Sequence, residues 1–166
     1  VAANVAVTID PAGQISAADA NAIAKATTGV VTATLKDGSV AATLKALTNV
    51  DTNDVLTFKT TDKTVKASDL VALNSKIANG TYTSIETITA DAKDVSYVSA
   101  ALGIANNADV TITGTITAAQ ANAIANATTE VLTATVEPDT AANLVTKLAN
   151  TDTDDMLTLA VNGTTA

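Results

Sequence analysis

Two short acidic segments hold the residues of this chain that are best suited to bind a metal ion. Asp51–Asp54 reads DTND and Asp152–Asp155 reads DTDD. Oxygen ligands this close together suit Ca²⁺, although both segments lack the glycine and glutamate of an EF-hand loop. The alternative is a polar turn in which Asp and Asn side chains bond to nearby backbone. We expect the turn and no cofactor, and the calcium candidates are Asp51, Asp54, Asp152, Asp154 and Asp155.

The composition leaves little for enzymatic catalysis. The chain has no His and no Cys, which removes imidazole acid–base chemistry, thiolate nucleophiles and ordinary zinc sites. Neither a GxGxxG nor a GxxxxGK[ST] phosphate-binding motif occurs. Ser and Thr are plentiful but have no His to activate them, and Ser68 has only Lys66 nearby in sequence. A catalytic site needs nucleophile, base and orienting group together, so we expect a protein that is not an enzyme.

Threonines, most of them in Thr-x-Thr pairs, form another candidate site. If their segments are strands, alternate residues share one face, and threonines would cover it. Thr is a good strand former that keeps an exposed sheet soluble. The face could equally pack on another copy of the chain, or bind an ordered surface such as ice or a glycan. The predicted face comprises Thr32, Thr34, Thr57, Thr81, Thr83, Thr111, Thr113, Thr133, Thr135 and Thr158.

An internal repeat indicates the elements that position these residues. Residues 15–58 align without a gap to residues 116–159, and about half of the aligned positions are identical. Repetition of this kind is typical of solenoid proteins. Short β-type runs recur along the chain, beginning at Val5, Val30, Val55, Thr81, Val110, Val131 and Met156.

Ala-rich stretches between these runs have helical spacing. Ala20, Ile23 and Ala24 follow the i, i+3, i+4 rule in residues 16–28. Thr117 with Gln120 fits a capping box, and Ser16 with Asp19 is a shorter variant. Alternating strands and helices of this length predict parallel strands, because parallel neighbours need a crossover connection.

The alternation within strands predicts which face is buried. Leu132, Ala134 and Val136 share one face of their run, and Thr133 and Thr135 share the other. Strands covered on both faces would be almost continuously apolar. The sequence therefore predicts an α/β fold with one domain over residues 1–166. It would be a β/α solenoid of about six strand–helix coils of about 25 residues, with one parallel sheet, helices on its apolar face and threonines on the other.

Charge and hydropathy exclude two classes of partner. The net charge is −8 and the isoelectric point is near 4.2. Nucleic acids and anionic membranes call for basic patches, so we expect neither as a partner. No apolar run approaches the roughly 18 residues of a membrane span. Aromatic residues make up 2% of the chain, so Ala, Val, Leu and Ile must form the core.

The two aligned segments also carry a family resemblance. The phrases ISAADANAIAKATTGVVTATLKD and ITAAQANAIANATTEVLTATVEPDTAANL resemble the Thr/Ala/Asp-rich tandem repeats of very large secreted cell-surface proteins of bacteria, marine cyanobacteria especially. The resemblance implies an extracellular or cell-surface location and a structural or adhesive role. It implies no catalytic residue.

The first and last predicted strands suggest how such a module assembles. Terminal repeats of solenoids usually carry polar caps, and neither of these strands has one. We therefore expect either a piece of a longer solenoid or a protomer that joins other copies head to tail in a filament, sheath or adhesin. The alternative is a binding module that uses the Thr face. The predicted assembly edges are Val5, Val7 and Ile9 at one end and Leu157, Leu159 and Val161 at the other.

Overall fold

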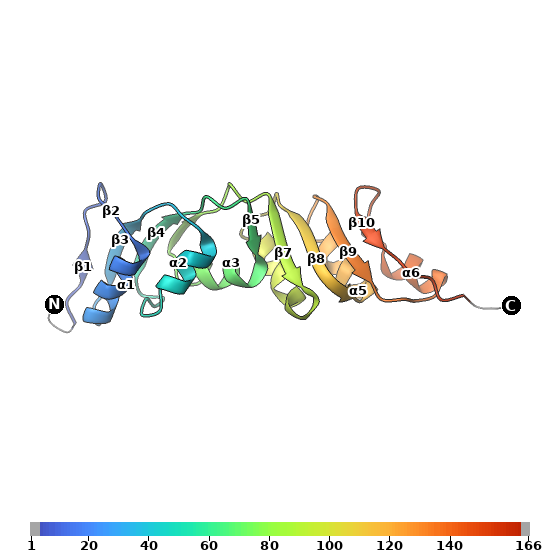
Figure 1. The fold of residues 1–166 in the computed structure, drawn as a ribbon, viewed down its shortest axis with the longest axis horizontal. Helices are drawn as coiled ribbons and strands as arrows, with labels where there is room; N and C mark the ends of the chain where they lie inside the picture. Colours follow the sequence, from blue (N-terminus) through green and yellow to red (C-terminus); the bar gives the residue numbers. More distant parts are fainter. Residues whose placement is uncertain (1–3, 164–166) are drawn as a thin grey trace. The chain divides into compact units, whose positions relative to one another are not determined.

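The structure, a computed structural model, describes residues 4–163 and contains helices and parallel strands in alternation (Figure 1). The described strands are β1 Val7–Thr8, β2 Gln14–Ile15, β3 Val31–Leu35, β4 Val55–Lys59, β5 Thr64–Lys66, β6 Asn79–Thr81, β7 Thr87–Asp91, β8 Asp109–Ile116, β9 Leu132–Val136 and β10 Met156–Thr158. The described helices are α1 Ala17–Ala26, α2 Val40–Ala46, α3 Ala67–Asn74, the 3₁₀ helix η1 Ala92–Tyr97, α4 Val98–Leu102, α5 Ala118–Ala125 and α6 Ala141–Lys147.

The chain forms two compact units. The first contains residues 4–65 and 69–85, and the second contains residues 66–68 and 86–163. The single domain expected over residues 1–166 stays a prediction.

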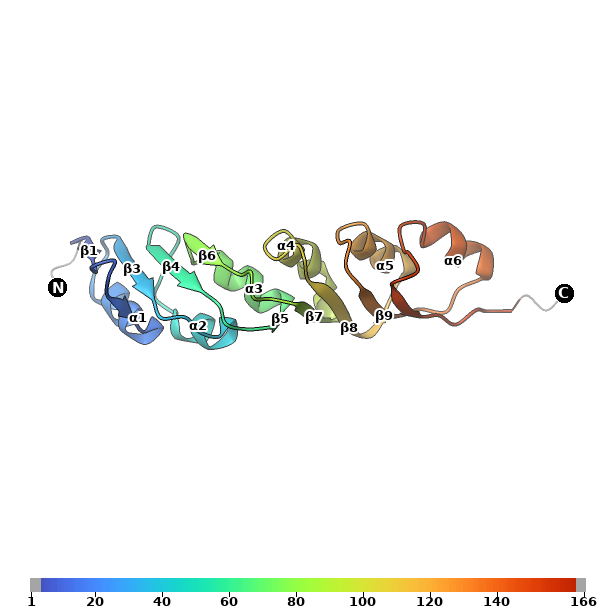
Figure 2. The ribbon, with the colours of Figure 1, turned by 90° about the horizontal axis from the view of Figure 1, so that it is seen from above.

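The first unit is built on a parallel sheet of order β1-β3-β4-β6, in which β2 also pairs with β3. Helix α1 connects β2 to β3 and α2 connects β3 to β4, as parallel neighbours require. Helix α1 packs on β3 and on α2 (Figure 2). The Ser16 hydroxyl accepts a hydrogen bond from the backbone N–H of Asp19, so the predicted N-terminal cap of this Ala-rich helix is confirmed.

The second unit repeats this arrangement in strands β7 to β10, which are parallel neighbours in that order. Helix α5 connects β8 to β9 and α6 connects β9 to β10. Helix α5 packs on β9 and on α6, as α1 does on β3 and α2. Thr117 and Gln120 form the predicted capping box at the start of α5.

The prediction of one sheet was wrong, because the parallel strands form two. The predicted strand from Thr81 is displaced: β6 ends at Thr81, and the N–H of Ile85 donates to the carbonyl of Tyr82 to close a turn. The Ser84 hydroxyl donates to the carbonyls of Thr60 and Asp62, which holds that turn against the preceding loop. Strand β7 was not predicted at all.

The buried side chains are those that the alternation predicted. Leu56 and Leu132 are fully buried, and none of the predicted threonines is buried. By the same alternation Leu157 should be buried beneath a helix as its equivalent Leu56 is, but it is only half-buried. The reason is that β10 is the edge strand of its sheet: among residues 4–163 it pairs with β9 on one side and with no strand on the other.

The sequence repeat is also a structural repeat. Strands β3 and β9, helices α1 and α5, α2 and α6, and strands β4 and β10 begin at equivalent residues. The similarity extends upstream, where the strand before the first helix is interrupted in both units. In the first unit, a turn closed by the Gly13 N–H and the Asp10 carbonyl separates β1 from β2. In the second, β8 contains a bulge at which Gly114 has φ of +87°, a value that glycine adopts without steric cost.

Small residues are required where helix and sheet come closest. Ala20 and Ala121 occupy equivalent helical positions, and both are fully buried. We expect Ala121→Leu to lower the free energy of unfolding by about 1–3 kcal/mol through overpacking. Chemical denaturation measures this. The control is Ala123→Leu on the exposed side of the same helix, which should cost much less; equal costs would contradict the packing assigned to α5.

Candidate functional site

The acidic turns, which are the calcium candidates, are hydrogen-bonded to the preceding strand. Asp54 is 8% exposed. Its Oδ1 accepts a hydrogen bond from the backbone N–H of Val31 at 2.8 Å, and its Oδ2 accepts one from Asp51 at 3.2 Å. Both carboxylate oxygens are therefore engaged by backbone donors, which is the arrangement that a structural turn needs.

The second unit repeats these bonds at equivalent residues. Oδ1 of Asp155 accepts from the N–H of Leu132 at 2.9 Å, and its Oδ2 accepts from Asp152 at 3.1 Å. Within the turn, the Asp152 carboxylate accepts from the N–H of Asp154 at 2.9 Å. The same short-range bond joins Asp51 and Asn53 in the first unit, at 2.8 Å. The predicted bonding of Asp to nearby backbone is confirmed, and the bond to the preceding strand was not predicted.

Over the described residues, no group of three or more acidic side chains is arranged to hold a metal ion. Calcium binding at these turns thus has to compete with the backbone hydrogen bonds of Asp54 and Asp155. We expect millimolar Ca²⁺ to leave the melting temperature unchanged, because only a ligand that prefers the folded state stabilises it. Differential scanning fluorimetry checks this. A rise of several degrees, lost in a variant with Asp152, Asp154 and Asp155 changed to Asn, would contradict the expectation.

The pair Ser68 and Lys66 lies in a small cavity of the second unit. The cavity has a volume of about 200 Å³ and is also lined by Asp91, Asp94 and Thr113. The Thr113 hydroxyl donates to Asp91 at 2.7 Å, and this bond lowers the pKa of Asp91, with a smaller contribution from Lys93 at 3.9 Å. The arrangement can hold a small polar molecule, and nothing in it activates Ser68.

The threonines of each sheet stand in register with one another. Pairs of opposed threonines join neighbouring strands at Thr8–Thr32, Thr34–Thr57, Thr89–Thr111, Thr111–Thr133, Thr115–Thr135 and Thr135–Thr158. Neighbouring strands are about 4.8 Å apart, so the hydroxyls form rows across each sheet. Thr57, Thr81, Thr113, Thr135 and Thr158 are exposed, and Thr32, Thr34, Thr111 and Thr133 are half-exposed.

Two features of this face differ from the prediction. Thr83 was expected on a strand, but it lies in the turn that follows β6, because Tyr82 is drawn into the core there, where it is 6% exposed. Thr87 and Thr89 were missed although they alternate with buried Ile88 and Ala90 on β7. That alternation is the signal that could have found this strand.

The predicted assembly edges are apolar positions, of which half are exposed and half are half-buried. Val5 is 46% exposed, and Val7 and Ile9 are half-buried. At the other edge, Leu159 and Val161 are exposed and Leu157 is half-buried. Strand β10 ends at Thr158, but Val161 forms an isolated parallel bridge with Asp139.

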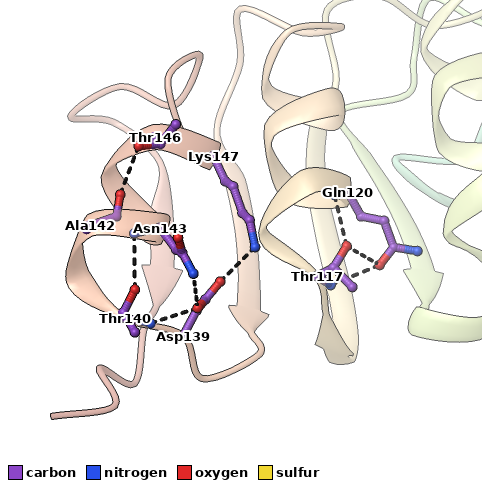
Figure 3. A network of polar contacts seen from close by, with 8 residues as sticks. All are labelled: Thr117, Gln120, Asp139, Thr140, Ala142, Asn143, Thr146 and Lys147. Carbon is purple, nitrogen blue, oxygen red and sulfur yellow. Dashed lines mark hydrogen bonds and ion pairs between the residues drawn. The ribbon is translucent and has the colours of Figure 1, made fainter. Parts of the chain in front are cut away.

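A polar network secures α6 beside this edge (Figure 3). The Lys147 ammonium donates to Asp139 at 2.8 Å, and the Asn143 amide and the Thr140 N–H donate to the same carboxylate at 2.8 Å each. Lys147, then Asn143 and Thr140, lower the pKa of Asp139 to about 2. The charged form is thus favoured in the folded state, so this contribution is present above about pH 4 and is lost as the pH falls toward 2.

No family model matches this chain, and comparisons with curated proteins and with solved structures found no match. Among residues 4–163, no helix has the length and apolar character needed to cross a membrane.

Proposed function

We propose that this chain is a structural repeat module of an extracellular or cell-surface filament, sheath or adhesin. Its strand–helix units would stack as a β/α solenoid of about six coils. Successive helices begin 23 to 27 residues apart, counting η1 with α4, which suits coils of similar length. The module would be non-enzymatic and would join either other copies or neighbouring repeats of a longer chain.

One observation carries this proposal: equivalent strands of the two units are paired on both sides in the first unit and on one side in the second. Strand β4 pairs with β3 and with β6, whereas its equivalent β10 pairs only with β9 among the described strands. An unpaired strand edge is a template for another parallel strand. The edge is apolar as well, since Met156 is 65% exposed and Val161 is 58% exposed. A module that stacks on its own kind accounts for both features.

The test is the assembly state of the unmodified chain. We expect light scattering and electron microscopy to show oligomers or filaments that grow with protein concentration. Growth should also increase with salt, because the net charge of −8 opposes contact between copies and salt screens that repulsion. A strictly monomeric chain at high concentration across the salt range would overturn end-to-end assembly.

The threonine rows favour a second candidate, a module that binds an ordered surface such as ice or a glycan. Rows about 4.8 Å apart across the sheet and about 6.7 Å apart along a strand present hydroxyls on a regular grid. Substitution of Thr111 and Thr133 by Lys would disrupt one row. Under this candidate the unmodified chain inhibits ice recrystallisation or is retained on a glycan array, and the variant loses that property while keeping its circular dichroism spectrum.

A further inference from the structure

The two copies of the repeat differ in how deeply the same positions are buried, and the difference marks an interaction surface. At the β10 side, Leu159 is 44% exposed, whereas the equivalent Phe58 in the first unit is 1% exposed. Val161 is 58% exposed and its equivalent Thr60 is 1% exposed. In the first unit these positions adjoin a further strand, because β6 pairs with Phe58 and Lys59 of β4.

The same side continues onto helix α6. Val145 is 80% exposed, whereas its equivalent Leu44 on α2 is half-buried. In the first unit, α2 is followed by α3 (Figure 2). We call Val145, Leu157, Leu159 and Val161 the trailing face. In the first copy of the repeat, the equivalents of Leu157, Leu159 and Val161 are buried, and the equivalent of Val145 is half-buried.

A complementary set lies at the β1 side of the first unit. Ile15 and Ile23 are half-buried, whereas the equivalent Ile116 and Ile124 are 1% and 4% exposed. In the second unit, a preceding strand β7 pairs with β8, which ends at Ile116. We call Ile9, Ile15 and Ile23 the leading face. Each of its residues is apolar, and Ile9 is also half-buried.

We propose that the trailing face of one copy of this chain docks on the leading face of a second copy and continues the parallel sheet. This inference rests on the proposed function and adds the partner, the surfaces and the register. The repeat identifies the partner as another copy of this chain. The positions equivalent to the trailing face are followed by a further strand in the first unit, and the positions equivalent to the leading face are preceded by a strand in the second unit. The contact joins two different surfaces, so it propagates in one direction.

The register follows from the pairings already present. Thr32 and Thr34 of β3 pair with Thr8 and Gln14 on one side, and the equivalent positions on β9 pair with Met156 and Thr158. If the second copy keeps these columns, Thr158 faces its Gln14. Leu157 and Leu159 then lie beside its Ile9 and Ile15.

Disulfide trapping tests this register, because the chain contains no cysteine of its own. Gln14 and Thr158 are exposed, and directly opposed strand residues lie within the Cα separation of a disulfide. A mixture of Gln14→Cys and Thr158→Cys chains should form mixed dimers under mild oxidation. A mixture of Ser75→Cys and Thr158→Cys chains is the control, since Ser75 is exposed but lies outside both faces.

A second measurement uses charge at the trailing face. Leu159→Asp should weaken association at least tenfold in sedimentation experiments. Tyr97→Asp is the matched control, because Tyr97 is also 44% exposed but lies on η1, and its association should be unchanged. Circular dichroism confirms that both variants are folded.

The outcomes separate this inference from the proposed function. Mixed dimers in the predicted pair, with association lost in Leu159→Asp alone, support it. Assembly of the unmodified chain that is indifferent to Leu159→Asp, or that traps Thr158→Cys chains with each other instead, overturns these surfaces but leaves self-association of the module standing. An unmodified chain that never assembles overturns both this inference and end-to-end assembly.

Discussion

Replacing Asp54 by alanine is expected to lower the free energy of unfolding by about 3–6 kcal/mol. The substitution removes two hydrogen bonds to a charged acceptor, each of which contributes about 1.5–3 kcal/mol. It also leaves the N–H of Val31 without its acceptor, at a residue that is fully buried, and an unsatisfied buried donor is costly. Urea denaturation followed by circular dichroism measures the change.

Three variants of the acidic turns calibrate that result. Asp54→Asn keeps one oxygen acceptor and should cost less than Asp54→Ala. Asp51→Ala removes only the exposed short-range bond to Asn53 and should cost less than about 1 kcal/mol. Asp155→Ala should lie between these values, because Asp155 is half-buried. Equal effects of Asp51→Ala and Asp54→Ala would show that the bond to Val31 does not stabilise the first unit.

This bond shows where sequence reasoning stops. The pattern DTND predicts a turn, and the local bond between Asp51 and Asn53 follows from it. The partner of Asp54 lies 23 residues earlier, and it is set by the register between β3 and β4. A pattern with a short range contains no information about that register. The two copies of the turn could therefore be recognised as equivalent, but their role in joining strands could not.

The regular elements were predictable where the repeat supplied two readings of the same segment. Strands β3 and β9 and helices α1 and α5 lie inside the aligned residues and agree with prediction. The errors in the placement of strands fall outside the aligned residues. A strand was predicted to begin at Thr81, although residues 81–91 contain the end of β6, a turn and then β7, which was not predicted.

The structural reason for a difference between the two copies could not be predicted from the sequence either. Gly29 aligns with Glu130, and a side chain at Gly29 would lie 2.4 Å from the carbonyl carbon of Val5. The backbone before β1 thus passes over a position where the second unit carries a full side chain. The sequence shows the substitution but not the chain that crosses it.

Burial of Tyr82 accounts for the displacement of the strand that was predicted to begin at Thr81. The same burial predicts a large loss of stability at alkaline pH. Its ring packs over Gly80, where an added Cβ would lie 2.3 Å from the ring. Its hydroxyl is buried without a hydrogen-bond partner. Burial raises the pKa of Tyr82 from 10.0 to about 12, because the charged phenolate is disfavoured there.

We expect this burial to make the fold sensitive to alkali. The raised pKa means that the folded state holds the phenolic proton more tightly than the unfolded state does. The resulting stability is fully present below pH 10 and is lost as the pH rises from 10 to about 12, in total about 2–3 kcal/mol.

Tyr82→Phe should remove this alkaline loss of stability. At neutral pH the substitution should be neutral or stabilising, since no hydrogen bond disappears. Tyr97→Phe is the control, because Tyr97 is exposed and its removal should leave the alkaline loss intact. Denaturation midpoints at pH 8 and pH 11 compare the three chains. If Tyr82→Phe lost as much stability as the unmodified chain between these pH values, the alkaline loss would belong to other groups and not to the Tyr82 phenol.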